Sequence, residues 1–165
     1  MKQSIGFVII TTIVTIVLSS CASTPESSAV LEENAVSIAD AVRDGYVNVT
    51  RKIPSKQRVV VLGVTGNDQS EAAWADDELI HLLVNAKRYT VLDRRRLDMN
   101  LAKRKPSGEI EETSVKELGY LLGAEMVLYG NINSYHNQIR FLSLKVMDVR
   151  SGEIIAITSE RFTAG

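Results

Sequence analysis

The continuous apolar run from Val59 to Val64 constrains the fold of this chain more than any other feature. It reads Val-Val-Val-Leu-Gly-Val and is bounded by the basic Arg58 and by the polar cluster Thr65-Gly66-Asn67-Asp68. A strand with one face in water alternates apolar and polar residues, whereas a strand covered on both faces is apolar throughout. The run therefore predicts a central strand in a sheet that has other elements packed on both faces.

A helix and a second strand are expected directly after this run. Asp68 followed three residues later by Glu71 is an N-cap pattern, and the apolar residues downstream keep helical spacing up to Asn85 or Ala86. Tyr89–Leu92 has the composition of a short strand. Asp93, which follows this strand, is a candidate N-cap for a further helix, and Leu97 and Leu101 would form the apolar face of that helix.

A separate helix is predicted upstream of the sheet. Apolar residues at near-helical spacing occur from Leu31 to about Val47, with Gly45 as the weakest position. Pro54 cannot continue a helix and biases Ile53 toward an extended backbone. Residues 31–56 are therefore expected to form an N-terminal helix and a linker, and residues 57–165 to form the α/β domain.

A fourth helix is predicted in the second half of the chain. Ser114 and Glu117 form a capping box for its start, and Gly123 is placed to end it in the left-handed conformation. The helix is expected to present three leucines, which are Leu118, Leu121 and Leu122.

The remaining sequence predicts three antiparallel strands. Residues 125–135, 138–149 and 153–162 have strand composition and are separated by short turns, the second of which contains Gly152. In the middle segment, apolar residues alternate with polar ones, so one face is buried and the other is partly wet. The complete pattern predicts an α/β (α+β) fold: a mixed sheet of about five strands with an antiparallel C-terminal three-strand meander, flanked by helices.

The N-terminus has the features of a bacterial export signal. Lys2 precedes an apolar stretch from Ile5 to Leu18, and the string Leu18-Ser19-Ser20-Cys21 resembles a lipobox. The resemblance implies cleavage between Ser20 and Cys21 and lipid on the Cys21 thiol. An uncleaved membrane helix would need roughly 20 apolar residues. An ordinary secreted domain could not form an intramolecular disulfide, because Cys21 is the only cysteine.

A lipobox divides the chain into a signal peptide (residues 1–20), a lipidated tether (21–30) and the parts that follow. The covalent lipid would be the only cofactor and would hold the protein on a membrane. Ala22 follows the cysteine, and by resemblance to Gram-negative sorting this favours the outer membrane, with the domain facing the periplasm. The formal net charge of −1 argues against nucleic acid, which needs a basic face.

No pattern of residues predicts catalysis. The two histidines, His81 and His136, have no second histidine or cysteine at ligand spacing, so no metal site is expected. The consecutive acids Asp76, Asp77 and Glu78 point around a helix and are predicted to form a solvated face. Serine elbows, phosphate loops and dinucleotide fingerprints are absent from the sequence. We therefore expect a protein that is not an enzyme.

Two features are candidates for binding a partner. Arg94, Arg95 and Arg96 begin a basic cluster that suits an acidic partner or anionic headgroups. Acids close in sequence, such as Asp93 and Asp98, favour solvated ion pairs instead. Trp74 has two interpretations as well. Burial statistics favour a core position, whereas the enrichment of tryptophan in binding hot spots favours an exposed contact.

Several strings resemble one family of exported proteins. Gly123-Ala124-Glu125-Met126-Val127-Leu128-Tyr129-Gly130 is similar to its glycine-flanked strand, and Val146-Met147-Asp148-Val149-Arg150-Ser151-Gly152-Glu153-Ile154-Ile155 to its hairpin. Tyr89-Thr90-Val91-Leu92-Asp93-Arg94 resembles its strand end. The family groups CsgG-like curli secretion channels, LpoB-like activators of penicillin-binding proteins and the N-terminal domain of TolB. The glycines in these strings are expected to have structural roles, and Gly130 would allow a neighbouring backbone to approach closely.

The resemblance implies a lipid-anchored, non-enzymatic envelope protein. Its partner would be another envelope protein, such as a peptidoglycan synthase that it activates. The alternative is a subunit of a curli-type secretion ring or a motility-associated ring in the outer membrane, which would make the protein a homo-oligomer. No loop here is long enough for the membrane-spanning hairpins of the channel members, and this favours the accessory role.

Overall fold

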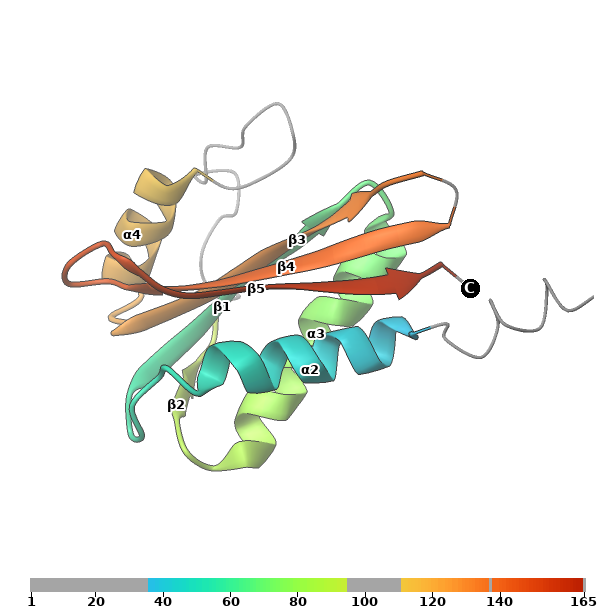
Figure 1. The fold of residues 1–165 in the computed structure, drawn as a ribbon. Coiled ribbons are helices and arrows are strands. Elements are labelled where there is room, and N and C mark those ends of the chain that lie inside the picture. Colours follow the sequence, from blue (N-terminus) through green and yellow to red (C-terminus); the bar gives the residue numbers. More distant parts are fainter. Residues whose placement is uncertain (1–35, 95–110, 137, 165) are drawn as a thin grey trace, which may run out of the picture. The chain divides into compact units, whose positions relative to one another are not determined.

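The computed structural model describes residues 36–94, 111–136 and 138–164, all within one compact unit, Asn34–Gly165. The predicted helix with Leu97 and Leu101 lies outside these residues. Figure 1 shows the described elements. In chain order they are α2 (Ile38–Thr50), β1 (Arg58–Gly66), α3 (Gln69–Ala86), β2 (Thr90–Leu92), α4 (Glu112–Leu121), β3 (Met126–Ser134), β4 (Ile139–Asp148) and β5 (Ile154–Thr163).

The five strands form one mixed sheet in the order β2-β1-β3-β4-β5. β1 is parallel to both of its neighbours, whereas β4 runs antiparallel to both β3 and β5. Val59 to Thr65 of β1 are all buried, which confirms the prediction of a central strand. The mixed five-strand sheet and the C-terminal meander are confirmed as well.

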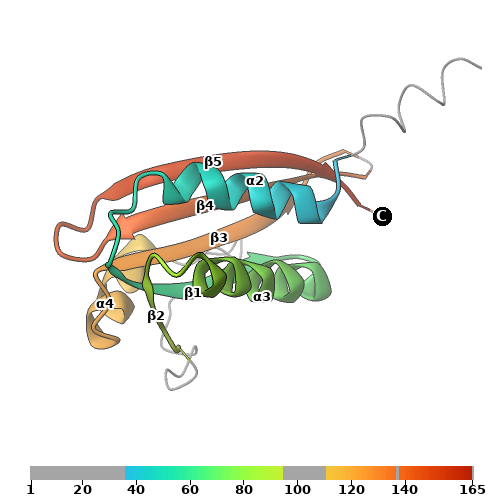
Figure 2. The same cartoon turned by 90° about the horizontal axis from the view of Figure 1, so that it is seen from below.

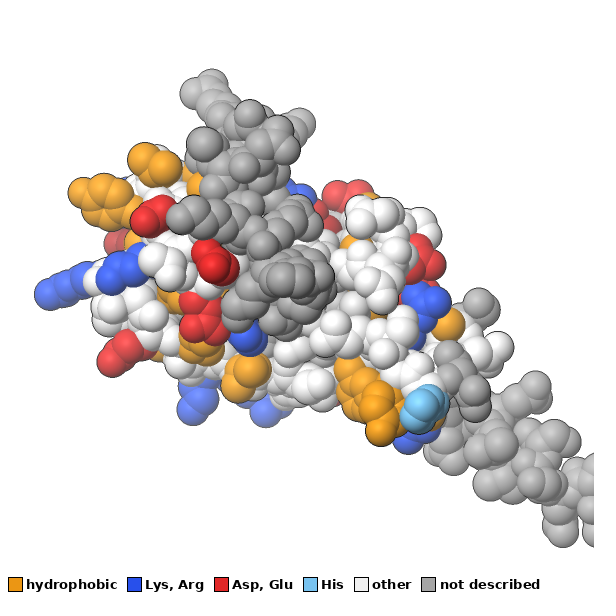
Figure 3. All heavy atoms as spheres, turned by 90° about the horizontal axis from the view of Figure 1, so that it is seen from above, with side chains coloured by type: hydrophobic (Ala, Val, Ile, Leu, Met, Phe, Trp, Pro, Cys, Tyr) orange, Lys and Arg blue, Asp and Glu red, His pale blue; other side chains and the backbone are white. Residues whose placement is uncertain are grey.

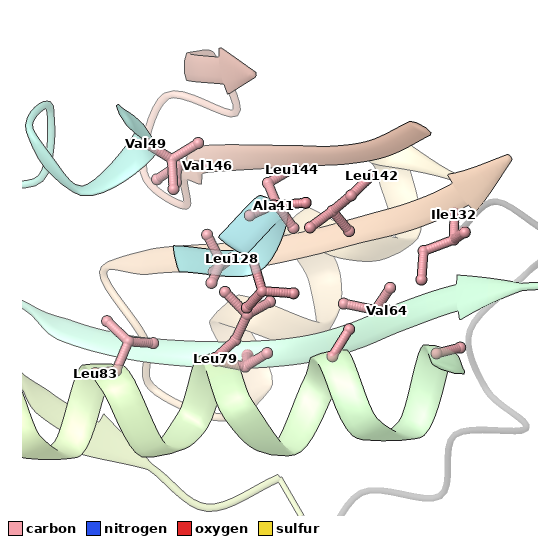
Figure 4. Packing of buried hydrophobic residues seen from close by; sticks show 14 of the residues in the cluster. Ala41, Val49, Val64, Leu79, Leu83, Leu128, Ile132, Leu142, Leu144 and Val146 are labelled. Atoms are coloured by element: carbon pink, nitrogen blue, oxygen red, sulfur yellow. The ribbon is translucent and has the colours of Figure 1, made fainter. Parts of the chain in front are cut away.

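Helices cover both faces of the sheet. α2 and α3 pack on one face and α4 on the other (Figures 1 and 2). Alternate residues of β1 therefore belong to different cores: Val59 and Val61 face α3, and Val60 and Leu62 lie in the cluster with α4. Figure 4 shows Leu79 and Leu83 of α3 pointing toward the strands. Each such buried side chain contributes about 1.5–3 kcal/mol of hydrophobic stabilisation.

α3 begins and ends where the sequence predicts. Asp68 is its N-cap, and its Oδ1 accepts hydrogen bonds from the backbone N–H groups of Ser70 at 3.0 Å and Glu71 at 3.2 Å. The Ser70 hydroxyl donates to the same oxygen. These bonds, of which the Ser70 hydroxyl bond has the largest effect, hold the pKa of Asp68 below the usual 3.8. The carboxylate form is therefore the one that stabilises the helix start.

The cap makes stability depend on pH in a defined direction. Because the folded-state pKa of Asp68 is depressed, its stabilisation is complete above the unfolded-state pKa, about 3.9, and is lost as pH falls through the folded value. Asp68→Asn keeps an oxygen acceptor and removes the titration. We expect the thermal midpoint of wild type to exceed that of Asp68→Asn at pH 7 and the difference to shrink below pH ~4. A difference that stays constant with pH would contradict this assignment.

α2 occupies a different range from the one predicted. It starts at Ile38, where the Ser37 hydroxyl accepts a hydrogen bond from the Asp40 N–H at 3.2 Å, and it continues to Thr50. The expected end near Val47 is therefore wrong. The helix passes through Gly45 because this residue packs on the sheet: a Cβ there would lie 3.0 Å from Leu144 Cδ1. Residues 31–35 of the predicted helix lie outside the described part of the chain.

α4 corrects the predicted capping box. The helix begins at Glu112, so Ser114 lies inside its first turn and is buried, and the actual N-cap Glu111 makes no side-chain capping bond. The predicted end is confirmed. Gly123 has φ +72°, its N–H donates to Tyr120 O, and the next N–H donates to Gly119 O, which is a Schellman motif. Gly152, with φ +81°, also has the expected turn conformation.

Gly130 lies in the middle of β3, where the neighbouring strand approaches closely, as predicted. A Cβ at this position would lie 2.5 Å from the backbone oxygen of Ser143 and 2.7 Å from Leu144 Cδ2. Since the first contact is backbone, β4 itself would have to move. We expect Gly130→Ala to lower the free energy of unfolding by about 1–3 kcal/mol. In urea unfolding, Ser134→Ala at the exposed end of the same strand should change it by less than ~0.5 kcal/mol, and equal effects would contradict the clash.

Candidate functional site

A largely buried ion pair joins Asp76 of α3 to Arg94, which follows β2. The Arg94 Nη2 donates to Asp76 Oδ2, and Nη1 donates to the backbone oxygen of Val61 at 3.3 Å. Their side chains are 23% and 8% exposed for Arg94 and Asp76, respectively. Burial lowers the pKa of the Arg94 guanidinium, which nevertheless stays cationic. The pair ties the segment after β2 to both α3 and β1.

A bulge in β1 makes room for the guanidinium. The register between β1 and β3 shifts between Val61 and Gly63, and Gly63 has φ +128°. A Cβ at Gly63 would lie 2.7 Å from Arg94 Nη1. Only glycine fits both the backbone conformation and the space. The glycine within the apolar run is the sequence signal for this bulge, which we did not predict.

This pair corrects two expectations. Asp76 was predicted on a solvated face with Asp77 and Glu78, yet it is buried, because the apolar stripe of α3 includes its position and Arg94 supplies a counter-charge. Arg94 was predicted to form solvated ion pairs, with partner binding as the alternative. It does form an ion pair, but with an acid 18 residues away and largely out of solvent. Arg95 and Arg96 lie outside the described residues, so their assignment as partner-binding residues stays a prediction.

Trp74 is exposed, and the core interpretation is wrong. The residues of α3 that face the sheet are Ala72, Ala75, Asp76, Leu79 and Leu83. Trp74 lies off this stripe, and 42% of its surface is accessible. An exposed tryptophan is compatible with the hot-spot interpretation, and its role in partner binding stays a prediction.

The C-terminal turn of α4 exposes two large apolar side chains. Val115, Leu118 and Gly119 face the sheet, which turns Tyr120 and Leu121 outward, 78% and 69% exposed. The expectation that Leu121 belongs to the buried face is therefore wrong. Tyr120 also lines a hollow of about 700 Å³, whose charged lining residues are Arg58, Lys116 and Arg150 together with Glu125 and Asp148. We call Tyr120 and Leu121 the α4 surface.

The described residues contain little that could perform chemistry. They include no group of three or more His, Cys, Asp or Glu side chains placed to hold a metal ion. His81 Nε2 lies 2.7 Å from the amide of Asn85, and His136 stacks edge-on against Tyr135. No helix in residues 36–94, 111–136 and 138–164 is long and apolar enough to cross a bilayer. Ser20 and Cys21 lie outside the described part, so processing and lipidation stay predictions.

Comparisons with known proteins show which family and which solved structures this chain resembles. A family model described as peptidoglycan-synthase activator LpoB matches residues 30–158. The fold is similar to the LpoB C-terminal domain from Escherichia coli, with TM-score 0.62, 20% identity and coverage of 78% of this chain and 99% of that one. The corresponding Salmonella enterica domain gives TM-score 0.59, 17% identity and coverage of 78% and 99%. A comparison with curated protein sequences finds no significant match. The comparisons support the LpoB part of the resemblance but not its CsgG part.

Proposed function

The chain belongs to the family of the peptidoglycan-synthase activator LpoB, and from this premise we propose that it is a non-enzymatic activator that binds a peptidoglycan synthase in the bacterial envelope. The observation that carries the proposal is the family match over residues 30–158, which includes every described element up to β5. The described residues hold few side chains arranged for catalysis or metal binding, which is consistent with a protein that acts by binding a partner.

The proposal includes anchoring by lipid on Cys21, at the outer membrane and facing the periplasm. The support is the order of a basic start, an apolar stretch and the string Leu18-Ser19-Ser20-Cys21. Two or more chains hold a protein stably, since each buried methylene contributes about 0.8 kcal/mol. The ring-subunit alternative would make the detergent-extracted protein a large homo-oligomer, whereas an activator can act as a monomer or dimer, and sedimentation separates the two.

We place the synthase contact on the α4 surface. Tyr120 and Leu121 are adjacent and each more than two-thirds exposed, so a partner that covers them removes more apolar surface from water than one that covers Trp74 alone. The neighbouring hollow is lined by charged side chains of both signs, which suits a polar rim around an apolar centre. Trp74 lies on the opposite face of the sheet, on α3, and is the competing contact.

A pair of surface variants distinguishes the two contacts. The mature protein is titrated onto its purified synthase, and the Kd of wild type is compared with those of Tyr120→Ser/Leu121→Ser and Trp74→Ser. All three positions are exposed, so folding should be unaffected, as circular dichroism would verify. We expect the α4 double variant to bind at least about tenfold more weakly and Trp74→Ser to bind like wild type. The reverse result would move the contact to α3, and no binding by wild type would contradict the proposed function.

A further inference from the structure

The start of α2 lies beside the β3–β4 turn and the end of β5. The Thr163 N–H donates to Val36 O at 3.0 Å, and the Ala164 N–H donates to Gln138 O at 2.8 Å. Figures 1 and 2 show the beginning of α2, the β3–β4 turn and the last strand at the same end of the sheet. The segment that leads from Cys21 therefore enters the domain at this end.

The same end carries a group of exposed and half-buried apolar side chains. Tyr135 is 67% exposed, and its ring meets the rings of His136 at 5.0 Å and Phe141 at 6.2 Å between centroids, both edge-on. Val36 is exposed nearby. Figure 3 shows one group of hydrophobic side chains next to a histidine and another at the opposite end of this face. We call Val36, Tyr135, His136 and Phe141 the tether-end surface.

Arg140 of β4, at this end of the sheet, is paired within the protein: it forms an ion pair with Glu71 and lies 3.6 Å from Asp68. Arg161 of β5 is exposed and lies opposite Phe141 in the strand register, so one cation stands beside the aromatic group. The tether-end surface thus combines aromatic rings with a neighbouring arginine. Aromatic and basic side chains of this kind sit at the boundary between headgroups and acyl chains.

We propose that the tether-end surface rests on the lipid bilayer, with Tyr135 at the membrane interface. The inference depends on the proposed lipid anchor at Cys21. About 15 residues separate Cys21 from Val36, so even fully extended they span no more than about 50 Å. A lipid attached that close keeps this end at a high local concentration next to the membrane. A few interfacial aromatic contacts then suffice to orient the domain.

The orientation has a consequence for the partner. β3 has 9 residues and so is about 30 Å long. Tyr135 follows its end, whereas Tyr120 precedes its start, separated by the helix end at Gly123. With the tether-end surface on the bilayer, the α4 surface is held at the far end of the sheet and faces away from the membrane, toward a synthase.

Depth-dependent quenching of tryptophan fluorescence tests the contact. The full lipidated chain is inserted into phosphatidylcholine vesicles whose acyl chains carry bromine. Its only tryptophan is replaced by Trp74→Phe, and a single reporter is added as Tyr135→Trp or, as a matched control, Tyr120→Trp. Both tyrosines are mostly exposed, so both reporters should be tolerated. We expect quenching of the Tyr135→Trp reporter to exceed that of the Tyr120→Trp reporter at least about twofold, with a blue-shifted emission, because an interfacial ring reaches the acyl boundary.

The possible results separate the anchor from the contact. Co-sedimentation with vesicles, compared with a chain that lacks residues 1–21, reports anchoring independently of quenching. If both reporter variants co-sediment and are quenched equally, the membrane contact is wrong and the proposed anchor stands. If neither co-sediments, the anchor fails and the inference falls with it. Stronger quenching of the Tyr120→Trp reporter would reverse the orientation and also overturn the inference.

Discussion

Asp76→Ala is expected to lower the free energy of unfolding by about 2–4 kcal/mol, a large part of the 5–15 kcal/mol typical of such domains. The substitution removes the carboxylate that neutralises Arg94 and leaves a guanidinium in the space beneath α3. Because Arg94 keeps 23% of its side chain exposed, the cost falls below that of a fully buried pair. Urea unfolding of the mature chain measures it.

Two further variants control this prediction. Asp77→Ala removes an exposed carboxylate from the same turn of α3 and should change the unfolding free energy by no more than ~0.5 kcal/mol. Asp76→Ala combined with Arg94→Ala should cost less than the sum of the two single substitutions, because no charge is left unpaired. Equal effects of Asp76→Ala and Asp77→Ala would show that the pair adds nothing to stability.

Cys21→Ser is expected to block both the lipidation and the cleavage of the protein. A hydroxyl cannot carry the thioether-linked lipid, so the product should lack the lipid mass and should no longer be cut before residue 21. The uncut product keeps the apolar stretch from Ile5 to Leu18, so it should stay with the membrane across which export begins and should no longer partition with the outer membrane. Intact mass and membrane partitioning of the extracted protein report both effects.

Ser20→Ala is the matched control for this variant. It keeps a small residue before the cleavage point and leaves the thiol in place, so mass and partitioning should equal those of the wild-type mature protein. If Cys21→Ser behaved in the same way as Ser20→Ala, the lipid anchor would be wrong, together with the orientation that we infer from it.

The order and type of the described elements could be predicted because local signals agree with the tertiary structure. The apolar run gave β1, the cap at Asp68 gave the start of α3, and the glycine at position 123 gave the end of α4. In each case the pattern reports burial or backbone conformation directly. The start of α4 could not be found in this way, because Ser114 is buried within the helix and its capping pattern is coincidental.

The site was harder to predict because its geometry comes from distant parts of the chain. Asp76 lies on the apolar stripe of α3, but its counter-charge Arg94 comes from 18 residues further along the chain, and Gly63 of β1 leaves the space that the guanidinium occupies. Trp74 has helix neighbours that are mostly apolar, and only the register of α3 on the sheet shows that it points outward. The α4 surface was missed since Leu121 looked like part of an apolar face.

The rate of glycan-strand synthesis shows whether this protein activates a peptidoglycan synthase. A purified synthase from the same bacterium is assayed with its lipid-linked substrate, with and without the mature protein, at concentrations where the two bind. We expect wild type and Trp74→Ser to increase the rate and Tyr120→Ser/Leu121→Ser to leave it unchanged. A rate that stays unchanged when the bound wild-type protein saturates the synthase would contradict the assignment as an activator.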